Sequence, residues 1–157
     1  MVQLEILSKE NEQKVLAIDR DDIPECFAES MAYTFQLSHY GTQYGMKGFC
    51  FAIKYLEDYV GTLLIGEAIQ DDADPDEVKN KSYFRVIGFV IDRRYRGRGI
   101  GSQAFSLALE MIYKEYGNVP ILLECHRKNQ SAMRFYEKMG FKNTNKLHNN
   151  DYYMVRL

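Results

Sequence analysis

Residues 96–101 read Arg-Gly-Arg-Gly-Ile-Gly and join a strand-length apolar run, residues 86–91, to a helix-length stretch. In that stretch, apolar side chains recur at helical spacing to about Tyr116. A strand that enters a helix through glycines leaves the first N–H groups of the helix unpaired, at the positive end of the helix dipole. Positive charges surround the turn on Arg93, Arg94, Arg96 and Arg98. The turn is therefore predicted to bind a pyrophosphate group.

Two common phosphate-binding motifs do not match this turn. A P-loop needs Lys-Ser or Lys-Thr after its last glycine, whereas Gly101 is followed by Ser102 and Gln103. A dinucleotide fingerprint needs the spacing Gly-x-Gly-x-x-Gly, whereas these glycines stand at 97, 99 and 101. Taken alone, the turn is also compatible with a tight connection that only packs a helix on a sheet.

A second signature follows downstream. Residues 120–125 read as a buried strand, and residues 129–141 read as a helix with Asn129 at its N-cap and Gly140 at its end. With both segments in place, the chain resembles the GNAT superfamily of acetyl-CoA-dependent N-acetyltransferases. The matching residues are Arg96, Gly99 and Gly101 in the first motif, and Leu123, Glu124, Asn129, Ala132, Tyr136, Gly140 and Phe141 in the second. The resemblance covers roughly residues 84–142.

The resemblance implies an α+β (mixed α/β) GNAT fold. Its sheet would be mixed, mostly antiparallel and seven-stranded, with helices on both faces and central strands that splay apart around the cofactor. The residue pattern agrees, with strands expected at 2–7, 49–56, 59–69, 82–91, 120–125, 141–147 and 151–157. Helices are expected from an Asp22 cap to Gly41, after the glycine turn, and after Asn129. Residues 71–77 read as an acidic loop, and residues 1–157 as a single domain.

Composition limits the classes of partner. With 46% hydrophobic and 27% charged residues, the chain is predicted to be globular. A net charge of −2 and locally clustered arginines argue against nucleic acid as the main partner. The cysteines Cys26, Cys50 and Cys125 are read as buried thiols of a reducing cytoplasm, and the histidines lack the spacing of a metal site. No leader or 18-residue apolar run is visible, so a cytoplasmic protein with no membrane partner is expected.

The resemblance further implies acetyl-CoA as co-substrate and direct acetyl transfer without an acyl-enzyme. The strand before the glycine turn would bind the pantetheine arm and the thioester, and the turn itself the pyrophosphate. Asn129 would contact the pantetheine amides as well as cap its helix. The residues assigned to the cofactor are Phe89, Val90, Ile91, Arg96, Gly97, Arg98, Gly99, Ile100, Gly101, Ser102, Asn129 and Tyr136.

Acetyl transfer to an amine requires that the amine lose a proton and that the departing thiolate gain one. Tyr136 matches the family's tyrosine and is the predicted general acid, because a phenol can protonate a thiolate of lower basicity. The alternative is that Tyr136 is a core aromatic residue.

The predicted base is Glu124. Polyamine-acetylating members of the family often carry a carboxylate in the strand before the turn, but Ile87 and Gly88 stand there. Glu124 matches the acidic residue of peptide-acetylating members, with an ion pair to Arg127 as its structural alternative. Glu67 is the second candidate for the base and a candidate substrate-binding residue, and a water relay to either carboxylate is a further alternative.

Three functions stay open for the acceptor. The favoured one is acetylation of a small cationic amine such as a polyamine, because the acidic loop and Glu67 would attract it. The others are a protein or peptide N-terminal acetyltransferase and a non-enzymatic acyl-CoA sensor. The acidic run is also compatible with a solvated turn, and Tyr33, Tyr40 and Tyr44 either line the acceptor site or only pack. Homodimers are common in the family, which leaves a homodimer open.

Overall fold

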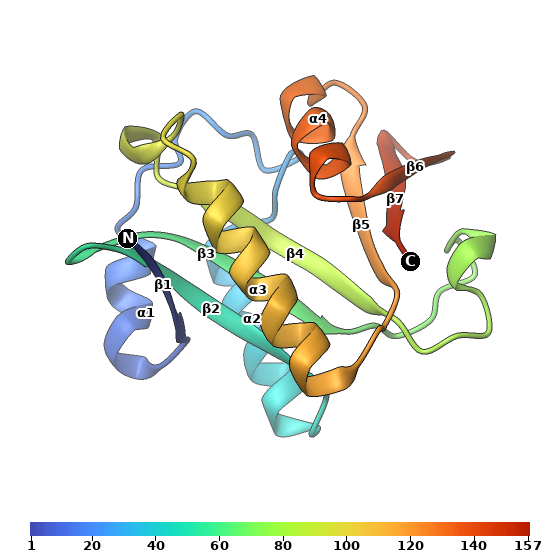
Figure 1. The fold of residues 1–157 in the computed structure, drawn as a ribbon, viewed down its shortest axis with the longest axis horizontal. Coiled ribbons are helices and arrows are strands. Elements are labelled where there is room, and N and C mark those ends of the chain that lie inside the picture. Colours follow the sequence, from blue (N-terminus) through green and yellow to red (C-terminus); the bar gives the residue numbers. More distant parts are fainter.

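The computed structural model describes residues 1–157 as one seven-stranded sheet with four α-helices (Figure 1). The first half of the chain forms β1 (Val2–Ile6), α1 (Lys9–Leu16), α2 (Met31–Gln43), β2 (Gly48–Tyr55) and β3 (Asp58–Glu67). The second half forms β4 (Phe84–Ile91), α3 (Ile100–Tyr116), β5 (Ile121–His126), α4 (Gln130–Lys138), β6 (Lys142–His148) and β7 (Asp151–Arg156). Short 3-10 turns, Asp76–Val78 and Arg93–Tyr95, precede β4 and α3.

The strand order is β1-β2-β3-β4-β5-β7-β6, and every neighbouring pair is antiparallel except β4 and β5. The parallel pair is held only at one end, where Phe84 faces Ile121 and Arg85 faces Leu122. Beyond these residues the two strands have no pairing between them. The mixed, mostly antiparallel sheet with splayed central strands is therefore confirmed.

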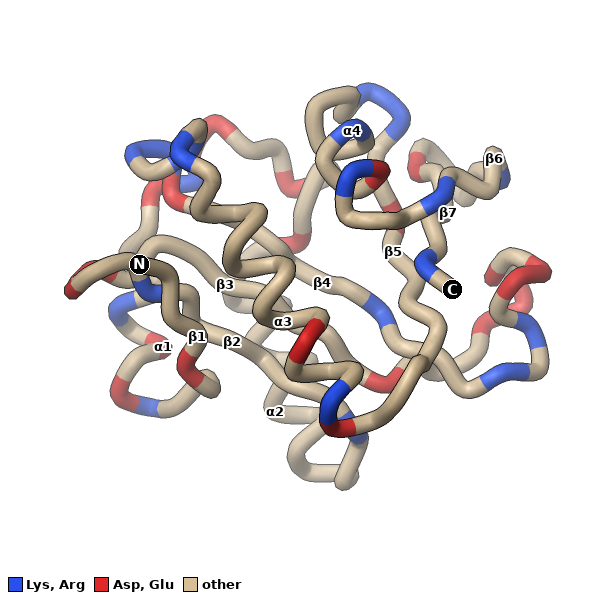
Figure 2. The backbone as a smooth tube through the Cα atoms, in the orientation of Figure 1, with Lys and Arg blue, Asp and Glu red and all other residues tan.

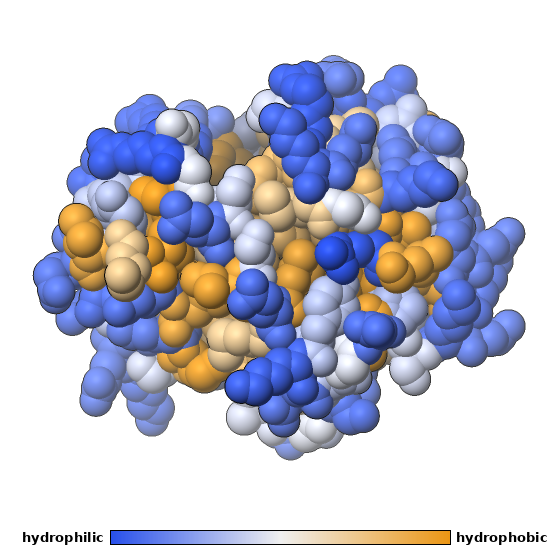
Figure 3. Space-filling view, viewed as in Figure 1, coloured by the Kyte–Doolittle hydropathy of each residue, from blue (hydrophilic) through white to orange (hydrophobic).

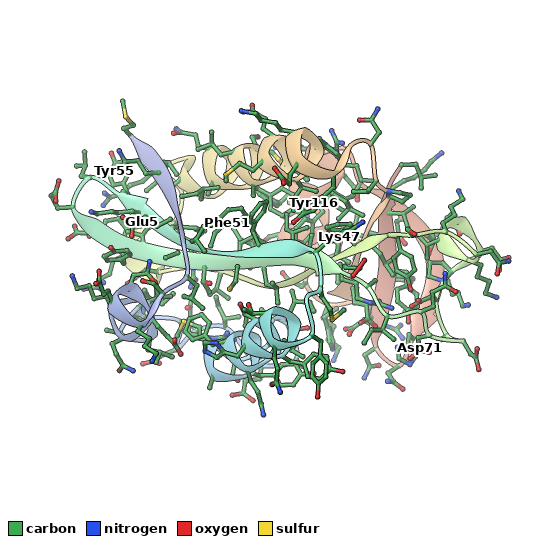
Figure 4. The ribbon with its side chains drawn as sticks, turned by 90° about the horizontal axis from the view of Figure 1, so that it is seen from below. Glu5, Lys47, Phe51, Tyr55, Asp71 and Tyr116 are labelled. Atoms are coloured by element: carbon green, nitrogen blue, oxygen red, sulfur yellow. The ribbon has the colours of Figure 1, made fainter.

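Helices cover both faces of this sheet (Figures 1 and 4). Helices α3 and α4 lie on one face, where a cluster of 20 buried residues forms the main core. Helices α1 and α2 lie on the other face over a smaller cluster that includes Val15, Phe35 and Val90. Phe105 of α3 is fully buried, and its ring lies 5.2 Å from that of Phe89 and 5.7 Å from that of Phe135. This one side chain thus joins α3 to both β4 and α4.

The N-terminal helices differ from the prediction. The helix expected from an Asp22 cap begins instead at Met31, with Ser30 as its N-cap. The Arg20 guanidinium donates to the backbone carbonyl oxygens of Ala28 and Glu29 at 2.9 and 2.6 Å, so the segment before Ser30 is held as a loop.

Helix α1 was not predicted from the sequence. Only two of its residues, Asn11 and Val15, are buried, so its apolar period is weak. The local signal for it was the capping box in which the side chains of Ser8 and Asn11 each accept a hydrogen bond from the other's backbone N–H.

The cysteines are free, and the prediction that all three are buried is wrong for Cys26, which is exposed on the loop before α2. Burial raises the pKa of the Cys50 and Cys125 thiols to about 11, so both stay protonated at neutral pH. None of the helices combines the length and the apolarity needed to cross a bilayer.

Candidate active site

The splay between β4 and β5 opens a cavity of about 590 Å³. Its walls come from the end of β4, the glycine turn, the exit of β5 and the face of α4. Eleven of the twelve residues predicted for the cofactor line it, and these are Phe89, Val90, Ile91, Arg96, Gly97, Gly99, Ile100, Gly101, Ser102, Asn129 and Tyr136. The structure therefore brings together two sequence motifs that lie about thirty residues apart in the chain.

The glycine turn has the backbone that an anion site requires. Gly97 and Gly99 both have a φ of 77°, in the left-handed region, and Gly99 is the N-cap of α3 without a side-chain cap. The hydrogen bond from Gln103 N–H to the Gly99 carbonyl, at 3.1 Å, begins the helix, so the preceding N–H groups face the cavity end of α3. The α3 dipole adds partial positive charge there.

Most of the arginine charge around the turn is already paired. Figure 2 shows acidic segments of the N-terminal half beside the basic turn at the start of α3. The pairs are Arg93 with Asp19, Arg94 with Asp92, and Arg96 with Asp22. Arg98 is the one predicted cofactor residue outside the cavity lining, and its guanidinium lies 5.4 Å from the ring centre of Tyr95.

Arg96 still has capacity for an anion. Its Nε donates to the Ile91 carbonyl at 2.8 Å and its Nη1 binds Asp22, but its Nη2 is buried without a hydrogen-bond partner. A buried donor of this kind is costly unless a ligand satisfies it. The residues of the turn therefore fit the diphosphate of coenzyme A.

Tyr136 projects from α4 into this cavity, beside the ring of Phe105 at 5.7 Å. Desolvation, with a smaller effect of the charge of Glu29, raises the pKa of Tyr136 well above its usual value. The phenol is thus neutral at physiological pH, and its hydroxyl makes no hydrogen bond within the chain. It is available to donate a proton. On the face shown in Figure 3, apolar side chains gather over α3 and toward α4.

A second cavity, of about 340 Å³, continues from the first. Residues common to both linings are Phe27, Ala28, Phe89, Glu124 and Tyr136. The second lining carries the carboxylates of Glu29, Asp71, Asp74 and Glu124 against a single guanidinium, that of Arg85. The two cavities therefore meet at Phe89 and Tyr136, and the second is predominantly acidic.

Glu124 lies on β5 where the cavities meet, with its side chain about one-third exposed (36%). Its partner is His148, whose Nδ1 lies 3.1 Å from Oε1, and not Arg127, the alternative partner expected from the sequence. The His148 ring stacks on Tyr153 at 5.8 Å. Glu124 is thus tied to the turn between β6 and β7.

The acidic loop is anchored by one buried residue. The Asp74 carboxylate accepts from Arg85 at 2.7 and 2.8 Å and from the Tyr83 hydroxyl, and Lys146 donates to its backbone oxygen at 3.1 Å. The Asp74 charge is therefore largely balanced. Asp71 also lines the second cavity, and Figure 4 shows it beside the C-terminal strands.

The remaining predicted residues lie farther out. Glu67 lines a third cavity beyond α2 and not the two that contain Tyr136. Tyr33 lines both the second and the third cavity, Tyr40 lines only the third, and Tyr44 lines none of the three.

One residue of the site was missed by the sequence reasoning. Glu29, just before α2, accepts a hydrogen bond from the N–H of Gly88 on β4 at 3.1 Å and lines the second cavity. The only local signal was Gly88 itself, because a glycine inside a strand often marks a bulge.

Comparisons with known proteins agree with this geometry. Residues 13–141 match the model of the acetyltransferase (GNAT) family. The chain is 34% identical over 61 residues to N-alpha-acetyltransferase 30 of Schizosaccharomyces pombe, a match that spans 39% of this chain and 39% of that curated relative.

Solved structures share the fold over nearly the whole chain. Naa50 of Arabidopsis thaliana in complex with the bisubstrate analogue CoA-Ac-MVNAL is 18% identical, with 99% of this chain and 98% of that one covered and a TM-score of 0.63. The aminoglycoside acetyltransferase AAC(6')-Ib in complex with coenzyme A is 16% identical, with coverage of 99% and 94% and a TM-score of 0.76.

Proposed function

Because this chain belongs to the acetyltransferase (GNAT) family, we propose that it transfers the acetyl group of acetyl-CoA directly to a primary amine. The observation that carries the proposal is the junction of two cavities between the splayed strands. One cavity has the backbone of a diphosphate site at its end, the other is acidic, and Tyr136 lies where they meet. Such an arrangement suits a ternary complex in which thioester and amine approach from opposite sides.

For acetyl-CoA, each part of the first cavity has a role. The N–H groups after Gly99 and the free Nη2 of Arg96 would hold the diphosphate. The unpaired edge of β4 at residues 89–91 would bind the pantetheine arm and thioester, since backbone polar groups require partners. Asn129 caps α4 through its bond to Ala132 N–H, at 3.3 Å, and lines the same cavity. Tyr136 would protonate the departing thiolate.

For the acceptor, the charge of the second cavity favours a small cationic amine such as a polyamine. The cavity is lined by Glu29, Asp71 and Glu124, and its guanidinium, that of Arg85, is already engaged by Asp74. A diamine would place its reacting nitrogen near Tyr136 and its second cation deeper in the second cavity, where the carboxylates would attract it.

A peptide N-terminus is the second candidate. The curated relative is an N-alpha-acetyltransferase, and one structural neighbour was solved with an analogue that carries a peptide. Glu124 on β5 matches the acidic residue expected of peptide-acetylating members. In that case the cleft would hold the backbone of the peptide, and a second cation on the acceptor would not raise kcat/KM.

The test is a thiol-release assay with acetyl-CoA and a matched panel of spermidine, 1,4-diaminobutane, butylamine and a Met-initiated pentapeptide. The proposal predicts that kcat/KM for the diamine exceeds that for butylamine by at least about tenfold, which is about 1.4 kcal/mol of transition-state binding. A preference for the pentapeptide would favour the second candidate. Binding of acetyl-CoA without thiol release toward any amine would leave the acyl-CoA sensor and overturn the enzymatic proposal.

A further inference from the structure

Strand β4 contains a β-bulge. Pairing with β3 steps from Leu64 opposite Ile87 to Thr62 opposite Val90. The two β4 residues between these positions, Gly88 and Phe89, therefore lie opposite a single residue of β3. Gly88 has a φ of 65°, and its N–H leaves the ladder and donates to Glu29 Oε2 at 3.1 Å. The contact joins residues 59 positions apart.

The backbone that carries Glu29 is fixed on both sides. Its carbonyl oxygen accepts from Arg20 at 2.6 Å, and the preceding carbonyl, of Ala28, accepts from the same guanidinium at 2.9 Å. The following residue, Ser30, caps α2 through its side chain. The carboxylate therefore enters the acidic cavity from a held position, which is what a reacting group requires.

Two carboxylates of this cavity, Glu29 and Asp71, have no charged or aromatic partner, and of these two only Glu29 is hydrogen-bonded to β4. Asp74 is paired with Arg85 and Glu124 with His148, whereas no ion pair involves Glu29. A carboxylate accepts about four hydrogen bonds, and the Gly88 N–H uses one of them. The remaining lone pairs are free for an ammonium donor, whose charge-assisted bonds are the strong ones.

Glu29 lies close enough to Tyr136, the predicted general acid, for its charge to act on the phenol. Glu29 and Tyr136 line the same cavity, and the charge of Glu29 contributes to the raised pKa of the phenol. Phe89, next to Gly88, opens the β4 segment that faces the first cavity. A carboxylate of the second cavity, a neutral phenol at the junction and the free strand edge of the first cavity thus line one continuous space.

We propose that Glu29 binds the reacting amine in its ammonium form and accepts its proton. The assignment rests on the proposed acetyl transfer and names the base for it. In space, Glu29 supplies the carboxylate that β4 lacks in sequence, where Ile87 and Gly88 stand. Glu124 is left with an orienting role, since it is more exposed and bonded to His148.

The chemical step then balances. One proton passes from the ammonium to Glu29, and the free amine attacks the thioester carbonyl carbon, forming the C–N bond. The C–S bond breaks as the tetrahedral adduct collapses, and the thiolate takes the proton of Tyr136. The second proton of the attacking nitrogen returns to the tyrosinate, and Glu29 releases its proton to solvent. The products are the N-acetyl amine, coenzyme A and one proton.

The test compares Glu29→Gln with the matched control Glu124→Gln. Each variant replaces one carboxylate of the same cavity by its isosteric amide, and the amide oxygen at position 29 still accepts from Gly88. Both are assayed at mildly alkaline pH with the best amine of the panel, which stays protonated there, and with its β,β-difluorinated analogue, whose reacting amine is largely neutral. Acetyl-CoA affinity by calorimetry and the thermal midpoint are measured alongside.

The proposal predicts that Glu29→Gln lowers kcat/KM for the protonated amine by about 100-fold, the usual effect of a lost general base. For the fluorinated amine, which needs no deprotonation, the loss is predicted to be below about tenfold. Acetyl-CoA affinity stays unchanged. Glu124→Gln is predicted to affect both amines equally.

Activity of Glu29→Gln within about threefold of the wild type, or an equal loss toward both amines, would overturn the assignment while acetyl transfer itself stands. A wild type that releases no thiol with any amine would overturn the proposed function and the assignment together. If Glu29→Gln does not fold, Glu29→Asp, which keeps the charge, is assayed with the same two amines. The loss of kcat/KM must again be larger for the protonated amine. An equal loss toward both amines overturns the assignment.

Discussion

Replacement of Gly88 by alanine tests the bulge in β4 that borders the proposed acceptor cavity. A Cβ at this position would lie 2.1 Å from Thr34 Oγ1 and 2.9 Å from its Cγ2, and Thr34 is fully buried on α2. Gly88→Ala is therefore expected to be destabilising in two ways. The left-handed φ of 65° costs an L-residue about 1–2 kcal/mol, and the overlap with Thr34 costs about 1–3 kcal/mol more.

The chain offers a matched control that separates these two costs. Gly45 has nearly the same φ, 66°, and no atom lies within 4 Å of the place that an alanine Cβ would take there, so Gly45→Ala carries only the backbone cost. The difference between the two variants in free energy of unfolding isolates the overlap. For a chain of this size, about 1–3 kcal/mol corresponds to a thermal midpoint about 2–12 °C lower for Gly88→Ala than for Gly45→Ala.

A double mutant then tests which atoms clash. Thr34→Ala removes Oγ1 and Cγ2, the two nearest atoms, so in the Gly88→Ala background it is expected to recover most of the overlap cost. Urea unfolding gives the four free energies of the cycle. Equal destabilisation by Gly88→Ala and Gly45→Ala, or no recovery in the double mutant, would refute the packing argument.

Three further predictions concern the cofactor, the acid and the fold. Gly99→Asp places a carboxylate at the diphosphate site and should weaken acetyl-CoA binding at least about tenfold by calorimetry, which is about 1.4 kcal/mol; unchanged affinity contradicts the site. Tyr136→Phe should lower kcat with unchanged acetyl-CoA affinity, since a proton donor acts in the transition state; unaltered turnover would make Tyr136 a packing residue. Asp92 is fully buried, and its bond to Arg94 lowers its pKa from 3.8 to about 2. Because the folded-state pKa is the lower one, its stabilisation is present above about pH 4 and is lost as pH falls through about 2. Asp92→Asn should therefore reduce the free energy of unfolding by about 2 kcal/mol at pH 7 and have little effect near pH 2, as urea unfolding at several pH values will show; a difference that does not change with pH would contradict this.

The residues that line the first cavity, which we propose for the cofactor, could be predicted because their signals are local. The glycine turn and the apolar period of α3 lie within about thirty residues, and strand, turn and helix each impose their own spacing. Arg98 shows the limit of this reasoning. Its position in the motif suggested a ligand contact, but the direction of an exposed side chain depends on its neighbours, here the ring of Tyr95.

The lining of the second cavity, which we propose for the acceptor, could not be predicted, because its contacts join distant segments. Glu29 reaches Gly88 across 59 positions, and His148 reaches Glu124 across 24, and neither spacing has a pattern in the sequence. The start of α2 was misplaced for a similar reason. Asp22 has the spacing of a capping box, but it pairs with Arg96 of the glycine turn, while Arg20 takes the carbonyl groups that a helix would need.

The position of Phe105 gives the cleft a mechanical property. Its ring fills the space where β4, α3 and α4 meet, so the distance between β4 and α4, the two walls of the cleft, is set by packing within the hydrophobic core. The cleft is therefore formed when the chain folds, and a thioester can bind there without first separating the strands. A smaller side chain at position 105 is therefore expected to let α4 move toward β4 and narrow the cleft, although the change removes no polar contact with a ligand.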